Sequence, residues 1–200
     1  MLIISGDSFS ARTNHRVWHD FLQPNPKNKI NLAWHGAGNF YIADSIKHII
    51  QANYKSIKKV IIFWSEYHRL DLLVKKPFNQ LHRMTPSGCW QFSGGIDNGS
   101  AKWKEVFADT IKIQGWDDII KRSISQVDET LQLLEKHDID FNFGFVYPDE
   151  NNKIFSKHKN FIPLIFRQWV QERNLHGVDD HHPSEDGHRL FAEEIKQYIG

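Results

Sequence analysis

The chain has 200 residues, a length typical of one domain, and it is almost neutral, with 25 basic and 24 acidic residues. That balance argues against a nucleic-acid partner bound through bulk positive charge. The single cysteine, Cys89, excludes an internal disulfide and a zinc site with several cysteines. No apolar run approaches the roughly 18 residues of a membrane span, and no signal peptide is visible. We expect no membrane span, and a location that is cytoplasmic or left open by the sequence.

Short apolar segments alternate with amphipathic segments along the chain. The patterns predict strands at residues 2–5, 30–33, 60–64 and 139–147, and helices at residues 12–22, 40–52, 116–137, 161–174 and 184–198. The unbroken apolarity of residues 60–64 is typical of a parallel strand that is covered on both faces. This alternation predicts one α/β domain over residues 1–200, a three-layer α/β/α sandwich around a mostly parallel sheet.

Residues 75–115 interrupt this alternation with prolines, glycines and scattered aromatic side chains. We interpret them as a loop-rich insertion with one short helix at residues 101–109, and a long insertion of this kind is usually functional or mobile. Trp90, Phe92 and Trp103 are candidates to stack on a sugar ring or to line an acyl pocket. Packing of the insertion onto the domain is the commoner role for such side chains.

The first predicted strand runs directly into Gly6-Asp7-Ser8. A serine in a tight turn between a strand and a helix exposes its hydroxyl and leaves its backbone N–H free, close to a helix N-terminus that favours negative charge. This pattern makes Ser8 a candidate nucleophile. The alternative is an ordinary helix cap, because a Gly-Asp-Ser triplet also arises by chance.

A second candidate segment, Asp179-Asp180-His181-His182-Pro183, precedes the last predicted helix. A serine nucleophile needs a base, and the base needs a group that orients it. His182 can be that base, and Asp179, three residues earlier, can orient its ring, with Asp180 as the other candidate. A solvated polar loop is one alternative. A metal site that also includes His181 and His188 is another, although the spacing matches no common zinc motif.

A third candidate segment follows the second predicted strand and contains Gly36. The backbone N–H of this glycine can donate to an oxyanion, although a glycine that only permits a tight turn is more common. The carboxyl ends of parallel strands meet at one edge of a sheet, which is where ligands bind in such folds. We therefore expect Ser8, Gly36 and the His182 segment to lie at the same edge.

Taken together, the order of these three segments resembles the SGNH (GDSL-like) hydrolase family over the whole chain. The resemblance implies a flavodoxin-like SGNH hydrolase fold, with Ser8 as the nucleophile and Asp179 and His182 as the acid and base of a triad. It also implies that Gly36, five residues after Asn31, supplies an oxyanion N–H beside that of Ser8.

The third block of that family departs from the pattern here. The family has Gly-x-Asn-Asp after the third strand, and the asparagine side chain donates to the oxyanion, whereas this chain has Ser65-Glu66-Tyr67-His68-Arg69. Tyr67 stands nearest to the missing asparagine and is the substitute donor that we name, because a phenol can donate a hydrogen bond. Ser65, His68 and Arg69 stand close by, and the histidine and the arginine can also donate. The alternative is that Glu66 and Arg69 only pair at the surface.

The resemblance implies a serine esterase that removes O-acyl or O-acetyl groups from a carbohydrate or a small ester, with no metal and no organic cofactor. The altered third block keeps a second hypothesis open, a weakened relative that binds a glycan through the same pocket. A third hypothesis is an interaction module that uses the aromatic insertion as a contact surface. The sequence does not fix the acyl group, the alcohol or the oligomeric state.

Overall fold

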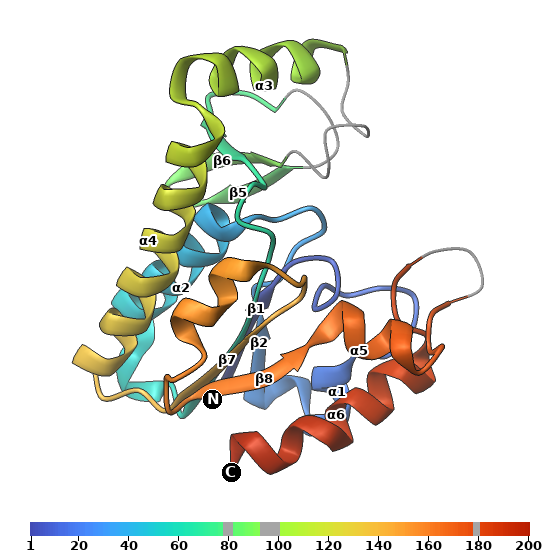
Figure 1. Ribbon diagram of the computed structural model, residues 1–200. Helices are drawn as coiled ribbons and strands as arrows, with labels where there is room; N and C mark the ends of the chain where they lie inside the picture. The colour runs from blue at the N-terminus through green and yellow to red at the C-terminus, as the bar shows by residue number, and fades with distance from the viewer. Residues whose placement is uncertain (78–81, 93–100, 178–180) are drawn as a thin grey trace.

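A computed structural model describes residues 1–77, 82–92, 101–177 and 181–200. Its central sheet has five parallel strands in the order β2-β1-β3-β7-β8 (Figure 1). These strands are β1 (Leu2–Gly6), β2 (Lys29–Asn31), β3 (Lys59–Trp64), β7 (Phe141–Phe145) and β8 (Phe161–Ile165). The helices are α1 (Trp18–Leu22), α2 (Asn39–Asn53), α3 (Ala101–Gln114), α4 (Trp116–Lys136), α5 (Phe166–Glu172) and α6 (Glu185–Ile199). Short 3-10 turns lie at η1 (Pro26–Asn28), η2 (Tyr54–Ser56) and η4 (Glu150–Phe155).

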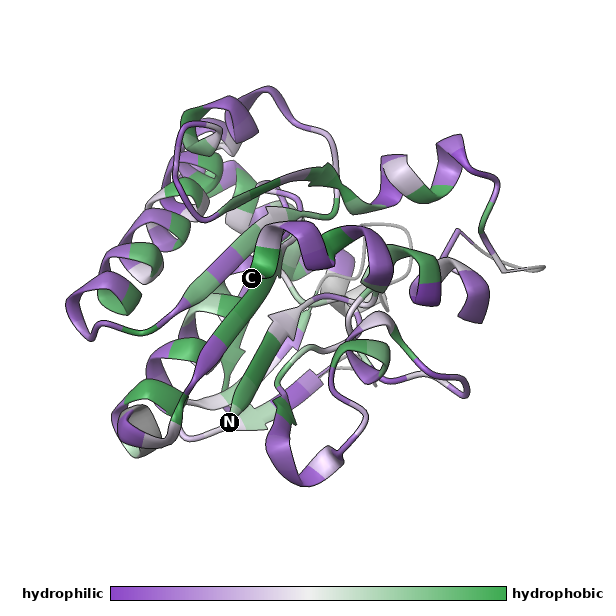
Figure 2. Ribbon diagram, turned by 90° about the horizontal axis from the view of Figure 1, so that it is seen from below, coloured by the Kyte–Doolittle hydropathy of each residue, from purple (hydrophilic) through white to green (hydrophobic). Residues whose placement is uncertain are grey.

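Helices cover both faces of this sheet, as the alternation of side chains along β3 requires. Successive side chains of a strand point to opposite faces. Accordingly, Ile62 packs in one hydrophobic cluster with α2 and α4, and its neighbour Phe63 packs in a second cluster with α1, α5 and α6. Figure 2 shows the strands as mostly hydrophobic between helices of mixed character. The expected three-layer α/β/α fold with a parallel central sheet is confirmed.

Two predicted helices were wrong in part. The helix expected at residues 161–174 begins only at Phe166, because the five residues before it form β8 and pair with β7. Pro163 is tolerated there because β8 is an edge strand and the residue is exposed. The helix expected at residues 12–22 begins at Trp18, where the Asp20 carboxylate accepts the N–H of Val17 and caps it.

The segment predicted as a loop-rich insertion, residues 75–115, contains two strands that form a sheet with a third strand just before it. Strands β4 (Asp71–Val74), β5 (His82–Thr85) and β6 (Gly88–Phe92) form a separate antiparallel sheet in the order β4-β6-β5. This small sheet lies beyond the end of the central sheet, next to α3 (Figure 1). Pro86 lies in the two-residue β5–β6 loop and Gly88 begins β6, where it pairs with Thr85, so that both residues obscured the strands in the sequence. Helix α3 also extends beyond the expected residues 101–109.

The aromatic side chains of the insertion pack onto the domain. Trp90 Nε1 donates to Asp44 Oδ2 on α2 at 2.9 Å, and the buried ring of Phe92 lies edge-on to Tyr41, with 5.0 Å between the ring centroids. Of the two roles considered for these side chains, packing is therefore the one that the contacts favour. The side chain of Trp103 is outside the described part. No helix in the described chain is long and apolar enough to cross a membrane.

Candidate active site

Ser8 lies in a tight turn, residues 6–11, at the carboxyl end of β1; we call it the Ser8 turn. The carbonyl of Asp7 accepts the N–H groups of Ser10 and Ala11 at 3.0 and 2.9 Å, and its carboxylate accepts the N–H of Phe9 at 3.0 Å. A side chain at Gly6 would place its Cβ only 2.9 Å from the carbonyl oxygen of Phe63 on β3. The turn is therefore fixed by its own backbone, and Ser8 remains half-buried.

The structure brings Ser8 together with His182, although 174 residues separate them. Ser8 Oγ and His182 Nε2 lie 2.8 Å apart, within hydrogen-bond distance. The ring of Phe9 also packs against the imidazole, with 5.1 Å between the ring centroids. This is the contact that a serine nucleophile and its base require.

The backbone around His182 is held by the start of α6. Ser184 caps that helix, because its hydroxyl accepts the N–H of Gly187 at 3.1 Å, and its own N–H donates to the carbonyl of Leu175 at 2.8 Å. The carbonyl of His182 accepts the N–H of Gly177 at 2.9 Å. These bonds fix the backbone on both sides of the imidazole.

The predicted orienting acid, Asp179, and the alternative, Asp180, both lie outside the described residues, so their roles stay predictions. Within the described ranges, no three His, Cys, Asp or Glu side chains are grouped to hold a metal. His188, one member of the metal hypothesis, is buried against the ring of Phe166, with 6.0 Å between the ring centroids. Burial lowers the pKa of His188 to about 3.

Gly36 lies in a turn, residues 34–37, beside the Ser8 turn; we call it the Gly36 turn. Its φ of 75° lies in the left-handed region, which explains the glycine. The N–H of Trp34 donates to the carbonyl of Gly6 at 3.2 Å, and Asn31 Nδ2 donates to the carbonyl of Ser10 at 3.0 Å, so β2 and its loop are tied to the Ser8 turn. The N–H groups of Ser8 and Gly36 donate to no atom in the described structure, which leaves them available to a ligand.

The side chain of Arg69 joins these loops. It is buried, and its Nη1 donates both to Asp7 Oδ2 at 3.2 Å and to the carbonyl of Ala37 at 3.3 Å. Its Nη2 donates to the hydroxyl of Tyr147 at 3.0 Å and lies 3.5 Å from Glu66. One guanidinium therefore contacts the Ser8 turn, the Gly36 turn and the loop after β7.

Arg69 and Asp7 each favour the charged form of the other. Burial acts to lower the pKa of Arg69, but Asp7, Tyr147 and Glu66 together raise it above its usual value, so the guanidinium stays charged. Burial raises the pKa of Asp7, whereas Arg69, the N–H of Phe9 and the hydroxyl of Ser65 act to lower it. The alternative that Glu66 and Arg69 pair at the surface was wrong about the location: the two side chains do pair, at 3.5 Å, but Arg69 is buried and also pairs with Asp7.

Tyr67, predicted as the substitute oxyanion donor, is almost completely buried. Its ring packs against Phe145, with 5.8 Å between the ring centroids, and its buried hydroxyl has no hydrogen-bond partner in the described structure. Burial raises the pKa of this phenol far above its ordinary value. The hydroxyl thus belongs to the core, and it is Ser65 and Arg69 of the same loop that contact the Ser8 turn through Asp7.

Two side chains that sequence reasoning missed hold the loops around the site. Asn39 Oδ1 accepts the N–H of Ser65 at 2.8 Å and so links the start of α2 to the loop after β3. Asp71 accepts the N–H groups of Gly38 and Tyr41 at 2.8 and 2.9 Å, and burial raises its pKa to about 7. In the sequence each of them was only a polar residue: Asn39 stands next to a glycine turn, and Asp71 stands a few residues after an apolar strand.

The chain was compared with known proteins. No protein-family model and no curated protein matches the sequence. The structure is similar to a crystal structure from Bacteroides fragilis that is named provisionally as an acylhydrolase, with a TM-score of 0.44 and 10% sequence identity. The similarity covers 99% of this chain and 85% of the other.

Proposed function

We propose that the protein is a serine esterase of the SGNH type that removes acyl or acetyl groups from a carbohydrate or a small ester. The observation that carries this proposal is the 2.8 Å distance between Ser8 Oγ and His182 Nε2 at the carboxyl end of the parallel sheet. The two free N–H groups of Ser8 and Gly36 support it, because a tetrahedral intermediate needs donors at its oxyanion.

In the proposed reaction, Ser8 Oγ attacks the ester carbonyl carbon while His182 Nε2 takes the hydroxyl proton. The carbonyl oxygen becomes an oxyanion that the N–H groups of Ser8 and Gly36 stabilise. His182 then gives its proton to the departing alcohol, which leaves an acyl-Ser8 ester. Water attacks this ester with His182 as the base, and the carboxylic acid and free Ser8 are released. Asp179 is proposed to hold the imidazole in the tautomer that accepts from Ser8.

Labelling with a fluorophosphonate probe, followed by mass spectrometry of the adduct, tests the nucleophile without knowledge of the substrate. We expect one adduct, on Ser8 and not on Ser10, which lies in the same turn but accepts a hydrogen bond from Trp18 Nε1 at 3.2 Å. Hydrolysis of p-nitrophenyl acetate should fall to the background rate in Ser8→Ala. Equal rates for wild type and Ser8→Ala, with no adduct on Ser8, would remove the esterase proposal and favour a ligand-binding relative.

A further inference from the structure

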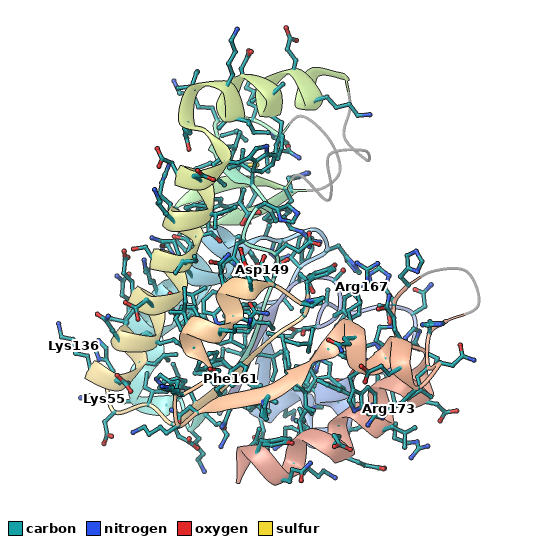
Figure 3. The ribbon with its side chains drawn as sticks, in the orientation of Figure 1. Lys55, Lys136, Asp149, Phe161, Arg167 and Arg173 are labelled. Atoms are coloured by element: carbon teal, nitrogen blue, oxygen red, sulfur yellow. The ribbon has the colours of Figure 1, made fainter. Side chains whose placement is uncertain are left out.

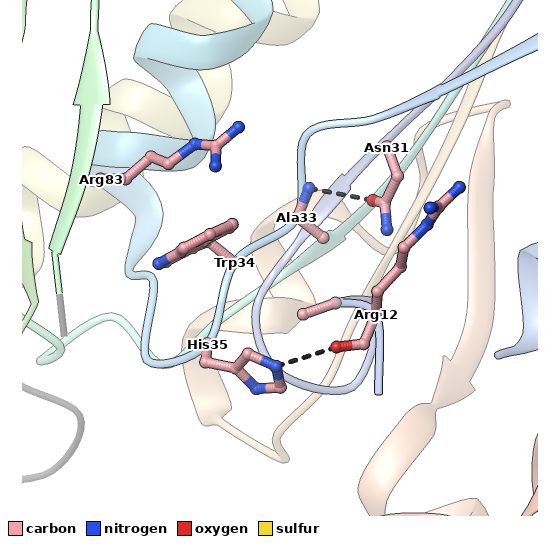
Figure 4. A pocket seen from close by; sticks show the side chains of 7 residues that line it. Arg12, Asn31, Ala33, Trp34, His35 and Arg83 are labelled. Carbon is pink, nitrogen blue, oxygen red and sulfur yellow. Dashed lines mark hydrogen bonds between the residues drawn. The ribbon is translucent and has the colours of Figure 1, made fainter. Parts of the chain in front are cut away.

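A cavity of about 330 Å³ lies beside the Ser8 turn, at the carboxyl end of the edge strand β2 (Figure 4). Its lining begins at Ala11, three residues after Ser8, and includes Arg12, Trp34, His35 and Arg83. The volume lies within the range of small-molecule sites. The cavity is therefore large enough for a monosaccharide or for a substituent of similar size.

The cavity gathers positive charge in a chain whose net charge is only +1. Two of its lining side chains are the guanidinium groups of Arg12 and Arg83, and none of its lining residues is acidic. Neither guanidinium lies within 4.0 Å of a carboxylate in the part of the chain that the structure describes. Arg69, by contrast, pairs with the carboxylate of Asp7.

The two arginines come from different parts of the fold and face one cavity. Arg12 follows the Ser8 turn, and its carbonyl lies 3.0 Å from His35 Nε2, which fixes that segment against the Gly36 turn. Arg83 belongs to β5 of the small sheet, and its guanidinium lies 4.2 Å from the centroid of the half-buried Trp34 ring. Figure 4 shows Arg83 and Trp34 on one side of the cavity and Arg12 and Asn31 on the other.

A third guanidinium is linked to the pair of Ser8 and His182 through aromatic side chains. Arg167, at the start of α5, lies 5.3 Å from the ring centroid of Tyr147, which in turn packs against Phe9. Figure 3 shows Arg167 at the same end of the sheet as Asp149, which follows β7. No carboxylate in the described ranges pairs with Arg167. Because the ring of Phe9 also packs against the imidazole of His182, Arg167 is connected to the proposed base through Tyr147 and Phe9.

We propose that this cavity is a subsite for an oxyanion group, a carboxylate or a phosphate, on the substrate of the proposed esterase. The planar guanidinium presents paired N–H donors that match both groups. An ester of an acidic or phosphorylated sugar would place its charged group between Arg12 and Arg83 and its ester carbonyl at Ser8. The inference deepens the proposed function and gives the small sheet a role, since β5 supplies Arg83.

Binding of three sugars that contain no ester tests this subsite without turnover. Methyl glucuronide, glucose 6-phosphate and neutral methyl glucoside are titrated into ¹⁵N-labelled wild-type protein, and the dissociation constants are taken from the chemical-shift changes. We expect at least one of the two anions to bind about tenfold more tightly than the glucoside, because hydrogen bonds to charged groups are the strong ones. The anion that binds identifies the carboxylate or the phosphate as the natural group. Added salt should weaken this preference.

Substitutions test whether Arg12 and Arg83 cause the preference for an anionic sugar. Arg12→Gln and Arg83→Gln should each lower the preference several-fold, and the double variant should abolish it. Arg173→Gln, in an exposed part of the chain beside Glu172, is the matched control and should change nothing. Equal binding of all three sugars, or a preference that survives the double variant, would overturn the inference. If the protein binds the anion but hydrolyses no ester, the esterase proposal would be wrong and the proposal of an anion subsite would still hold.

Discussion

The loops that follow β1 and β3 lie side by side, yet they contribute in opposite ways. The Ser8 turn after β1 leaves a hydroxyl half-exposed, 2.8 Å from His182 Nε2. The loop after β3 buries the side chains of Ser65 and Arg69, and both contact the buried carboxylate of Asp7 in that turn. In the proposed reaction the first loop supplies the nucleophile, and the second loop holds the first in place. Substitutions in the two loops should therefore differ in their effects on kcat and on the free energy of unfolding.

The largest expected effect concerns Asp179, the residue proposed to orient His182. Asp179→Asn should lower kcat for p-nitrophenyl acetate about ten-thousandfold, because an amide stabilises the wrong tautomer of the imidazole and cannot support its positive charge. Asp180→Asn is the matched control, and it should keep most of the activity. Circular dichroism and urea unfolding should show both variants folded.

The opposite result is equally informative. Full activity in Asp179→Asn, together with a large loss in Asp180→Asn, would move the orienting role to the neighbouring aspartate. Full activity in both would mean that His182 needs no carboxylate, and the triad would then reduce to a pair of Ser8 and His182.

The second prediction tests whether the loop after β3 acts as support. Arg69→Met should lower the free energy of unfolding by about 3–5 kcal/mol, because it leaves the carboxylate of Asp7 buried without its partner charge. The kcat should fall as well, since the Ser8 turn and the Gly36 turn lose the guanidinium that joins them. Urea unfolding and steady-state kinetics measure the two effects.

A double variant measures the interaction between Asp7 and Arg69 apart from their other contacts. Asp7→Asn combined with Arg69→Met should cost less than the sum of the two single substitutions, because no unpaired charge remains. Strict additivity of the unfolding free energies would show that the ion pair between Asp7 and Arg69 contributes nothing of its own. Arg69→Lys should not restore kcat, because one ammonium cannot reach Asp7, Ala37 and Tyr147 together.

The third prediction concerns Asp71, which accepts two N–H groups at the start of α2. Burial raises its folded-state pKa to about 7, above the ordinary 3.8, so the folded protein binds this proton more tightly than the unfolded chain does. The stability that this group contributes is therefore fully present below about pH 4 and is lost as the pH rises through about 7.

The amide of the Asp71→Asn variant cannot ionise, so this variant lacks the dependence of stability on pH that Asp71 causes. The free energy of unfolding of the variant, minus that of wild type, should rise between pH 4 and pH 8 in urea titrations. Asp128→Asn, at an exposed position of α4, should show no comparable rise. A constant difference for Asp71→Asn across this range would show that the carboxylate is charged in the folded protein throughout.

The sequence predicted the layers of the fold because the alternation of strands and helices is a local pattern. It predicted the meeting of Ser8 with His182 because the carboxyl ends of parallel strands share one edge and the order of the three segments resembles a known family. It did not predict the role of Arg69, because burial of an arginine depends on partners that are distant in the chain. It also missed β8, where Pro163 suggested the first turn of a helix. Such features are set by tertiary pairing, which a local pattern does not contain.

The smallest expected effect also gives the sharpest contrast between the two loops. Tyr67→Phe removes a buried hydroxyl that has no hydrogen-bond partner in the described structure. We expect kcat to stay within about twofold of wild type, and the free energy of unfolding to be unchanged or higher by up to about 1 kcal/mol, because an unsatisfied buried hydroxyl is costly. An oxyanion donor would behave differently, since its loss lowers kcat about a hundredfold to a thousandfold. A loss of that size, with stability unchanged, would return Tyr67 to the oxyanion and would mean that the loop after β3 also takes part in the chemistry.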